Sequence, residues 1–362
     1  MAIEFSARVK RTPGYPMAPA YDLPQDIALM ASNESPEPPL GAVVAAVQAV
    51  LSGTNRYPDP TNAKLRAALS TRFDVPVDRI AIGSGSCEIL MTAGDVLLEP
   101  GAEIVYAWPS FSVYPYLEAA TGARGIRVPL NDRHEHDLDA MLAQITVATR
   151  LVIVCNPNNP TSTAIPMDDI AAFLDKVPRH VCVLLDEAYC EFNTLDDPDT
   201  SVDLLKQHSN LVLMRTFSKI YGLCGLRVGY ALCGDSRFVT AVDQVRQPFF
   251  CNIAAQAAAI EALRHQDVVA ERVERNIVAR VQVESALQEL GLEPAQSQAN
   301  FCWFDLPEDG PSEADVVKGL ADRGVLVRAG TGLGREGALR VTYGTPQQND
   351  RFIAALRALL DA

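Results

Sequence analysis

The sequence predicts an α/β protein in which a largely parallel sheet, with helices on both faces, is followed by a smaller α+β unit. Three observations indicate this fold. The chain has 362 residues and 48% of them are hydrophobic, so it is long enough for two domains with a large core. Short apolar runs alternate with helical patterns up to about residue 245, as in parallel strands joined by crossover helices. After that residue, long helices come first and short strands follow.

The first forty residues differ from the rest by their prolines. Seven prolines fall between residues 13 and 39. Proline fixes φ and removes a backbone donor, so it disfavours the interiors of helices and sheets. We therefore predict a surface arm over residues 1–40 that joins the small domain, a large domain over 41–245 and a small domain over 246–362.

The large domain is predicted to contain a series of short strands, each of which ends in a polar loop. In an open α/β sheet, ligands bind beyond the carboxyl ends of the strands, so the chemistry is expected in these loops. A helix is expected at Ile89–Leu98. The predicted strands are Arg79–Ile82, Glu103–Ala107, Leu151–Cys155, Val181–Leu185, Leu211–Arg215 and Val228–Cys233.

The small domain is predicted to begin with a charged amphipathic helix over Glu261–Leu290. Its last helix opens at Thr345–Gln348, where threonine can cap, proline suits the first turn and glutamine can reach back in a capping box. Its strands are expected at Ala299–Phe304, Val325–Arg328 and Ala338–Thr342.

Charge and composition exclude several classes of function. There are 45 acidic and 31 basic residues, and the net charge of −14 would repel nucleic acid or an anionic membrane. The chain starts without the apolar run of a signal peptide and has no apolar stretch of about 18 residues, which predicts a cytoplasmic protein without a membrane span. Its eight cysteines are scattered singly, with no C-x-x-C pair. We expect no metal site, and we interpret most of the cysteines as small core residues.

The loop Gly83–Glu88 lies between the first predicted strand and a helix. Such a loop directs free backbone N–H groups and the positive end of the helix dipole at an anion. Neither nucleotide motif fits, because Glu88 occupies the place of the third glycine of a dinucleotide fingerprint and no P-loop lysine follows. A tight glycine turn without a ligand is the alternative at this loop.

Two further loops carry amides and acids. Asn156–Thr161 has two prolines that stiffen the backbone and three asparagines that offer neutral hydrogen bonds. Asp186 and Glu187 follow the apolar run Val181–Leu185, where an unpaired buried charge would be costly. An ordinary turn and a structural ion pair are the respective alternatives.

The fourth loop contains Lys219, with hydroxyls just before it at Thr216 and Ser218 and with Arg227 eight residues further on. A lysine at the mouth of a strand can be desolvated and can lie beside a bound phosphate, and both conditions suit a Schiff-base lysine. Taken alone, a solvated surface lysine is the alternative.

Together the four loops offer what one cofactor needs. Pyridoxal 5′-phosphate (PLP) requires a carboxylate for its pyridine nitrogen, neutral or phenolic donors for its ring oxygen, a lysine for its aldehyde and an anion cradle for its phosphate. All four kinds of group occur at strand ends. We therefore predict a PLP enzyme in which Lys219 holds the cofactor.

The motifs resemble those of class I and II aminotransferases, which are PLP enzymes of fold type I, and the likeness runs nearly from end to end. The branch it resembles contains histidinol-phosphate aminotransferase and its aromatic, or phenylalanine, aminotransferase relatives. This resemblance implies a mainly parallel, seven-stranded sheet in the large domain. It is carried by the segments Ala31–Glu34, Arg56–Asp59, Asn156–Thr161, Asp186–Tyr189, Arg215–Gly229 and Leu339–Thr342.

The resemblance also implies a role for each matching residue. Lys219 would form the Schiff base, Asp186 would pair with the pyridinium nitrogen, and Asn159 and Tyr189 would bond the ring oxygen. Arg340 would hold the substrate carboxylate. Phe111 would stack on the ring, and the cofactor phosphate would be bound by Ser86, the backbone of Cys87, Thr216, Ser218 and Arg227.

A homodimer is implied as well, because in this family Tyr57 would reach the phosphate of the neighbouring subunit's cofactor. The substrates would be an amino acid and a 2-oxo acid. The freed Lys219 would carry the proton, and the kinetics would be ping-pong, because the cofactor stores the amino group between two half-reactions.

The substrate is judged from two positions. Enzymes that use histidinol phosphate must bind a second phosphate, commonly with an asparagine at the position of Cys87 and a tyrosine at that of Phe249. Both donors are missing here, and each hydrogen bond to a charged acceptor is worth about 1.5–3 kcal/mol. Compensation by Tyr15, Asn33 or Tyr114 is the alternative. We therefore predict an aromatic amino acid aminotransferase with a phenylalanine-like donor, and histidinol-phosphate aminotransferase is the second candidate.

Two other classes compete with this prediction. Related PLP enzymes decarboxylate or eliminate, so a decarboxylase or lyase is the third candidate. A PLP-binding regulator fused to a DNA-binding module is the non-enzyme alternative. The chain leaves no room for such a module, and the charge of −14 argues against it.

Overall fold

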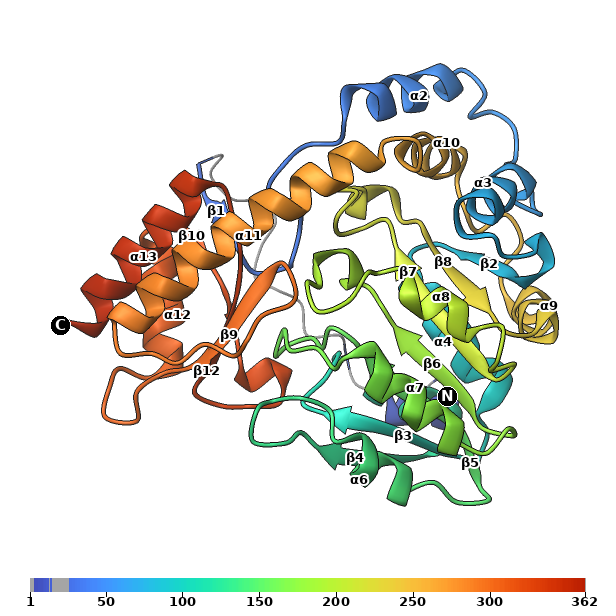
Figure 1. The fold of residues 1–362 in the computed structure, drawn as a ribbon, viewed down its shortest axis with the longest axis horizontal. Coiled ribbons are helices and arrows are strands. Elements are labelled where there is room, and N and C mark those ends of the chain that lie inside the picture. The colour runs from blue at the N-terminus through green and yellow to red at the C-terminus, as the bar shows by residue number, and fades with distance from the viewer. Residues whose placement is uncertain (1–2, 13, 15–25, 362) are drawn as a thin grey trace.

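A computed structural model describes residues 3–12, 14 and 26–361. A seven-stranded sheet lies at its centre, in the order β2-β8-β7-β6-β5-β3-β4 (Figure 1). Every pairing is parallel except the two that β8 makes with β2 and β7. The strands are β2 (Ile80–Gly83), β3 (Glu103–Trp108), β4 (Arg124–Pro129), β5 (Thr149–Cys155), β6 (Cys182–Asp186), β7 (Leu211–Thr216) and β8 (Gly229–Cys233). The predicted fold class is confirmed.

Six of these strands were predicted, and their ends agree to within two residues. The strand β4 was not among them. It lies at the edge of the sheet, Val128 is its only buried side chain, and Gly125 and Pro129 interrupt its apolar pattern. An edge strand with one buried side chain lacks the continuous apolar run by which the others were found.

Helices cover both faces of the sheet, because its central strands are apolar on both sides. In β5, Val152 and Val154 belong to one core cluster, and Leu151, Ile153 and Cys155 belong to the other. The first cluster is completed by α2 (Gly41–Leu51), α3 (Ala63–Phe73), α6 (Leu138–Ala143), α7 (Met167–Lys176), α8 (Thr200–Leu204) and α10 (Ile253–Ala262). The second cluster is completed by α4 (Ser86–Leu97), α5 (Tyr114–Thr121) and α9 (Ser236–Val245).

The C-terminal unit packs three helices against a small antiparallel sheet of order β11-β12-β9. Its elements are α11 (Gln266–Glu289), β9 (Phe301–Asp305), α12 (Glu313–Asp322), β10 (Val325–Leu326), β11 (Arg328–Ala329), β12 (Ala338–Thr342) and α13 (Pro346–Leu360). Turns of 3₁₀ helix occur at Val77–Arg79, Cys190–Phe192, Cys224–Leu226 and Thr331–Leu333. The predicted capping box of the last helix is present, since Thr345 and Gln348 each bond the other's backbone.

Two predictions for this unit were wrong in detail. The stretch Glu261–Leu290 is not one helix, because α10 ends at Ala262 and α11 begins at Gln266. The stretch Val325–Arg328 is not one strand either. Its first half pairs with β1 (Ala28–Leu29) and its second half with β12.

The N-terminal segment contacts both units. A short helix, α1 (Ala7–Arg11), precedes the first proline and lies against α5, where Arg11 donates to the carbonyl of Ala119. Further along, β1 pairs in parallel with β10 of the C-terminal unit, while the predicted domain boundaries stay predictions. Within the described part of the chain, no helix has the length and apolar character needed to cross a membrane.

Candidate active site

A pocket of about 480 Å³ opens beyond the carboxyl ends of β5, β6 and β7. It gathers side chains from all four predicted loops, together with residues of the N-terminal segment and of β12. The predicted residues that line it are Asn33, Ser86, Cys87, Phe111, Asn159, Asp186, Tyr189, Thr216, Ser218, Lys219, Arg227 and Arg340. The four loops predicted to carry the functional residues therefore meet at one pocket.

Lys219 follows β7 and is only partly buried, with its amine turned to the N-terminal segment. Its Nζ donates to the carbonyls of Ser32 at 3.2 Å and Asn33 at 3.0 Å, and lies 5.4 Å from the ring centre of Tyr189. Burial and the nearby charge of Arg340 lower the pKa of Lys219 to about 8. A larger neutral fraction at physiological pH makes this amine a better nucleophile and proton carrier.

Asp186 ends β6 and is 3% exposed. Its carboxylate accepts hydrogen bonds from the hydroxyl of Tyr114 at 2.8 Å and the backbone of Ala188 at 3.2 Å. Burial raises its pKa to about 6, and the Tyr114 hydrogen bond opposes that shift. Both donors are neutral, so this carboxylate would gain from a cation bound in the pocket.

The adjacent acid, Glu187, has a different partner. It forms an ion pair with the fully buried Arg215 at 2.8 Å, and Arg215 also bonds Asp199 and Ser201. The structural ion pair considered for this loop therefore involves Glu187, while Asp186 faces the pocket.

In the loop Asn156–Thr161, two asparagines hold the backbone in place and the third lines the pocket. Asn156 exchanges two hydrogen bonds with the backbone of Ile165, and Asn158 bonds Ser110 and Thr161. These bonds hold the loop, and they leave the third asparagine at the pocket. Asn159 accepts a hydrogen bond from Arg340 at 2.6 Å and donates to the hydroxyl of Tyr189 at 3.4 Å, and Asn33 donates to the same hydroxyl at 3.0 Å.

The residues predicted to form a phosphate cradle meet at the N-terminus of α4, which begins at Ser86. Thr216 and Ser218 share a hydrogen bond of 2.9 Å, and Arg227 reaches Ser218 at 3.5 Å. The loop comes so close to Arg227 that a Cβ on Gly85 would lie 2.4 Å from its Nη2, and Gly85 also has φ +76°. Glycine is needed there, because it allows the helix end and the guanidinium to converge on one point.

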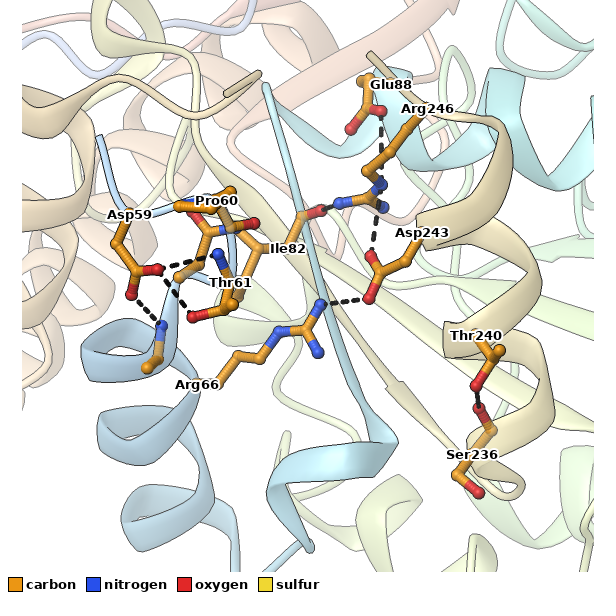
Figure 2. A network of polar contacts seen from close by, with 12 residues as sticks. Asp59, Pro60, Thr61, Arg66, Ile82, Glu88, Ser236, Thr240, Asp243 and Arg246 are labelled. Atoms are coloured by element: carbon orange, nitrogen blue, oxygen red, sulfur yellow. Dashed lines mark hydrogen bonds and ion pairs between the residues drawn. The ribbon is translucent and has the colours of Figure 1, made fainter. Parts of the chain in front are cut away.

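A polar network joins the end of β2 and the first turn of α4 to α9 and α3 (Figure 2). Arg246 donates to the carbonyl of Ile82, contacts Glu88 at 3.9 Å and Asp243 at 3.5 Å, and Asp243 bonds Arg66 of α3 at 2.8 Å. Glu88 in turn accepts from the backbone of Ser84. Glu88, which stands where a dinucleotide fingerprint would need its third glycine, therefore supports the loop Gly83–Glu88.

Two predicted site residues that the structure describes, Tyr57 and Phe249, are not found in the pocket of their own chain. Tyr57 is 80% exposed and stacks on Phe249, which is 40% exposed, with ring centres 4.5 Å apart. Neither residue lines the pocket. Tyr15 lies outside the described residues. Tyr114 is fully buried and bonded to Asp186, so it does not supply the donor that was considered for a substrate phosphate.

Sequence reasoning did not identify Arg328 of β11, which lines the pocket together with Arg340 and which no local pattern marks. It named Tyr114 only as a donor to a substrate phosphate and did not predict its hydrogen bond to Asp186. The other residues that line the pocket are Ala31, Ser32, Glu34, Ser112, Cys155, Ala188, Cys224, Gly225 and Leu333.

Comparison with known proteins places the chain in a family. A family model described as aminotransferase class I and II matches residues 25–356. An aromatic amino acid aminotransferase from Thermobifida fusca is 43% identical over 91% of this chain and 89% of its own length. Histidinol-phosphate aminotransferase 2 from Ralstonia nicotianae is 41% identical, with coverages of 92% and 89%. The chain therefore belongs to the aminotransferase class I and II family.

A solved structure agrees with this assignment. The crystal structure of histidinol-phosphate aminotransferase from Sinorhizobium meliloti in complex with pyridoxal-5′-phosphate has a TM-score of 0.85 and 29% identity, over 92% of this chain and 91% of that one. The present protein is a PLP-dependent transaminase. Its pocket fits the cofactor, because among the described residues Asp186 has only neutral hydrogen-bond donors, and Gly85 lets the guanidinium of Arg227 approach the helix end, where an anion would be held.

The variant Tyr114→Phe should shift the pH dependence of PLP binding. PLP should bind less tightly as the pH falls through about 6, because protonation of Asp186 removes its negative charge. Loss of the Tyr114 hydrogen bond raises the Asp186 pKa further. The midpoint should move up by about one pH unit, since a hydrogen bond to a charged group contributes about 1.5 kcal/mol. Fluorescence titration of the apoenzyme with PLP at a series of pH values measures this.

The matched control is Tyr116→Phe on the same helix, because Tyr116 donates to the carbonyl of Gly14 at the surface instead. Its midpoint should equal that of the unchanged enzyme. Equal midpoints for the two variants would show that Tyr114 does not tune Asp186.

Proposed function

We propose that this enzyme transfers the amino group of an aromatic, phenylalanine-like amino acid to a 2-oxo acid. Cys87 carries the proposal. It lines the pocket beside the helix N-terminus, and burial raises the pKa of its thiol, so it stays neutral and offers little to a second phosphate. Phe111 and Leu333 add apolar surface to the same pocket. The similarity to aromatic amino acid aminotransferases supports the same substrate class.

The pocket residues have distinct roles in this proposal. When bound, PLP supplies an electron sink that stabilises negative charge at the substrate Cα. The buried carboxylate of Asp186 would keep the ring nitrogen protonated, and Asn159 and Tyr189 would donate to the ring oxygen. The phosphate would be held by Ser86, the backbone of Cys87, Thr216, Ser218 and Arg227, and Phe111 would pack against the ring.

Lys219 holds the cofactor and afterwards moves the proton. With its pKa lowered to about 8, its amine releases and accepts a proton near neutral pH, as a base in this step must. Arg340 would hold the substrate carboxylate, because the residue is 7% exposed and its guanidinium donates to Asn159 and to the carbonyl of Ala31. Asn33 orients Tyr189.

The working unit in this proposal is a homodimer in which Tyr57 and Phe249 enter the partner's active site. Two stacked aromatic rings with 80% and 40% exposure form an apolar projection that a partner would cover. Asp59 accepts three hydrogen bonds from Thr61 and Ala63 and so fixes the loop that carries Tyr57. Tyr57 would bond the neighbour's cofactor phosphate, and Phe249 would contact the neighbour's substrate.

Histidinol phosphate is the second candidate donor. Arg328 and Arg340 both line the pocket, and two guanidinium groups suit an anionic substrate. Relatives named histidinol-phosphate aminotransferase are 41% and 42% identical to the chain. The measurement below separates the two donors.

The kcat/KM for phenylalanine should exceed that for histidinol phosphate by at least about tenfold, which corresponds to about 1.4 kcal/mol. The double variant Cys87→Asn with Phe249→Tyr should narrow this ratio, because it restores two donors to a phosphate. Cys224→Asn, at another cysteine of the pocket, is the control and should leave the ratio unchanged. An equal or reversed ratio in the unchanged enzyme would overturn the choice of donor. Release of carbon dioxide or ammonia would point to a decarboxylase or lyase.

The variant Lys219→Ala should abolish transamination and covalent attachment of the cofactor, while it still binds PLP through the phosphate cradle. Turnover assays, and mass spectrometry after borohydride reduction, measure the two losses. Lys206→Ala is the control, because Lys206 is an exposed lysine paired with Asp203. Near-normal turnover in Lys219→Ala would refute the assignment of Lys219.

Mixing two inactive variants tests the shared site. Lys219→Ala and Tyr57→Ala should each be impaired when pure, but a hybrid dimer contains one site with an intact Lys219 from one chain and an intact Tyr57 from the other. Activity should therefore rise after the two variants are unfolded and refolded together. Activity equal to the mean of the two pure variants would mean that Tyr57 serves its own chain or no site.

A further inference from the structure

Arg272 of α11 joins two segments of the chain that both reach Lys219. Its Nη1 donates to the carbonyl of Ile220 at 2.7 Å, and its Nη2 donates to the carbonyl of Pro38 at 3.0 Å. Its Nε lies 3.4 Å from the carboxylate of Glu37. Each nitrogen of this guanidinium therefore has a different partner, an arrangement that the planar fork of arginine allows and the single nitrogen of lysine does not.

The first of these segments is the turn that follows Lys219. The backbone of Gly222 donates to the carbonyl of Lys219 at 2.9 Å, so residues 219–222 form one tight turn. Gly222 has φ +69°, and a Cβ added to it would lie 3.3 Å from the Nη1 of Arg272 and 3.6 Å from the carbonyl oxygen of Glu37. The turn is thus packed directly against Arg272 and against the second segment.

The second segment runs from Ser32 to Pro38 and carries the acceptors of the lysine amine. The Nζ of Lys219 donates to the carbonyls of Ser32 and Asn33 at the beginning of this segment. Its other end is held at Pro38 by Arg272. The lysine and its acceptors therefore lie on two segments that the same guanidinium ties together.

The place of Arg272 is costly for a cation. Its side chain is 9% exposed, and burial lowers its pKa, while the charge of Glu37 opposes that shift. Arg275, three residues further along α11, also donates to Glu37, at 2.8 Å, and its side chain is 50% exposed. Since an exposed arginine already neutralises Glu37, the ion pair alone does not account for the buried one. The two backbone carbonyls do.

We infer that Arg272 is a positioning residue for Lys219. By tying the turn after Lys219 to the segment of Ser32 and Asn33, it fixes where the amine lies relative to its two carbonyl acceptors. An amine that carries a proton must leave such a place and return to it while the backbone around it stays still. The inference rests on the proposed role of Lys219, and it is independent of which amino acid the enzyme prefers.

Competitive labelling of the apoenzyme with acetic anhydride measures how firmly the amine is held, with the exposed Lys206 as the internal reference. Peptide mass spectrometry gives the ratio of the Lys219 rate to the Lys206 rate. Arg272→Lys keeps the charge beside Glu37 but does not bridge the two carbonyls. The ratio should rise at least about threefold, because the amine loses its acceptors and its neutral fraction grows. Arg275→Lys is the matched control and should leave the ratio unchanged.

In the holoenzyme, Arg272→Lys should lower kcat at least about tenfold and leave the KM of the amino donor within about twofold, because the proton carrier is misplaced while the substrate contacts stay. Arg272→Met removes the buried charge together with the bridge. It should give the same results in both assays, and it replaces the lysine variant if that variant does not fold. Equal labelling ratios in the folded Arg272 and Arg275 variants, or a rise in KM alone, would overturn the inference.

Borohydride reduction of the unchanged holoenzyme, followed by peptide mass spectrometry, separates this inference from the proposed function. PLP is expected on Lys219. PLP on Lys219 combined with unchanged labelling in the Arg272 variants would refute the positioning role alone. PLP on another lysine would refute the assignment of Lys219 and, with it, the positioning role.

Discussion

The carboxylate of Asp186 is buried at the end of β6 with neutral hydrogen-bond donors, and the rest of the site is arranged around that charge. A rise in pKa from the ordinary 3.8 to about 6 corresponds to roughly 3 kcal/mol against the charged form. Between these two pH values the folded chain binds a proton more readily than the unfolded chain, so this residue lowers stability as the pH rises through that window. A ring cation in the pocket would offset the cost. The same charge therefore destabilises the empty site and selects the cofactor.

Two neighbouring acids, Asp186 and Glu187, have different partners, because successive side chains along a strand point to opposite faces of the sheet. Asp186 lies with Tyr114, at the pocket, and Glu187 lies with Arg215, whose guanidinium packs near the ring of Phe73 in the other core cluster. Alternation predicts that the two point to opposite faces. It does not say which face holds an arginine, since Arg215 comes from another strand. The structural ion pair considered for this loop is made by Glu187, and the role of Asp186 at the pocket stays a prediction.

The sequence predicted those strands of the large sheet that are buried on both faces. Strands with two buried faces are continuous apolar runs, so six were found, whereas β4 at the sheet edge left no such signal. The apolar spacing of Glu261–Leu290 persists through the break before Gln266, and periodicity therefore missed the turn between α10 and α11. Pocket residues that follow strand ends were predictable from their loops. The position of Arg328 and the hydrogen bond of Tyr114 to Asp186 were not predictable, because only the packing of distant elements creates them.

The polar network beside the glycine loop joins that loop to α9 and α3. Arg246 joins the end of β2 and Glu88 to Asp243, and Asp243 holds Arg66 of α3 (Figure 2). A separate set of hydrogen bonds, from Thr61 and Ala63 to Asp59, fixes the loop before α3 that carries Tyr57 and lowers the Asp59 pKa. The predicted phosphate cradle and the exposed Tyr57 are therefore held by different contacts. In the proposed homodimer, where Tyr57 would bond the neighbour's cofactor phosphate and Phe249 would contact the neighbour's substrate, a change of substrate at Phe249 need not disturb the chemistry at Lys219.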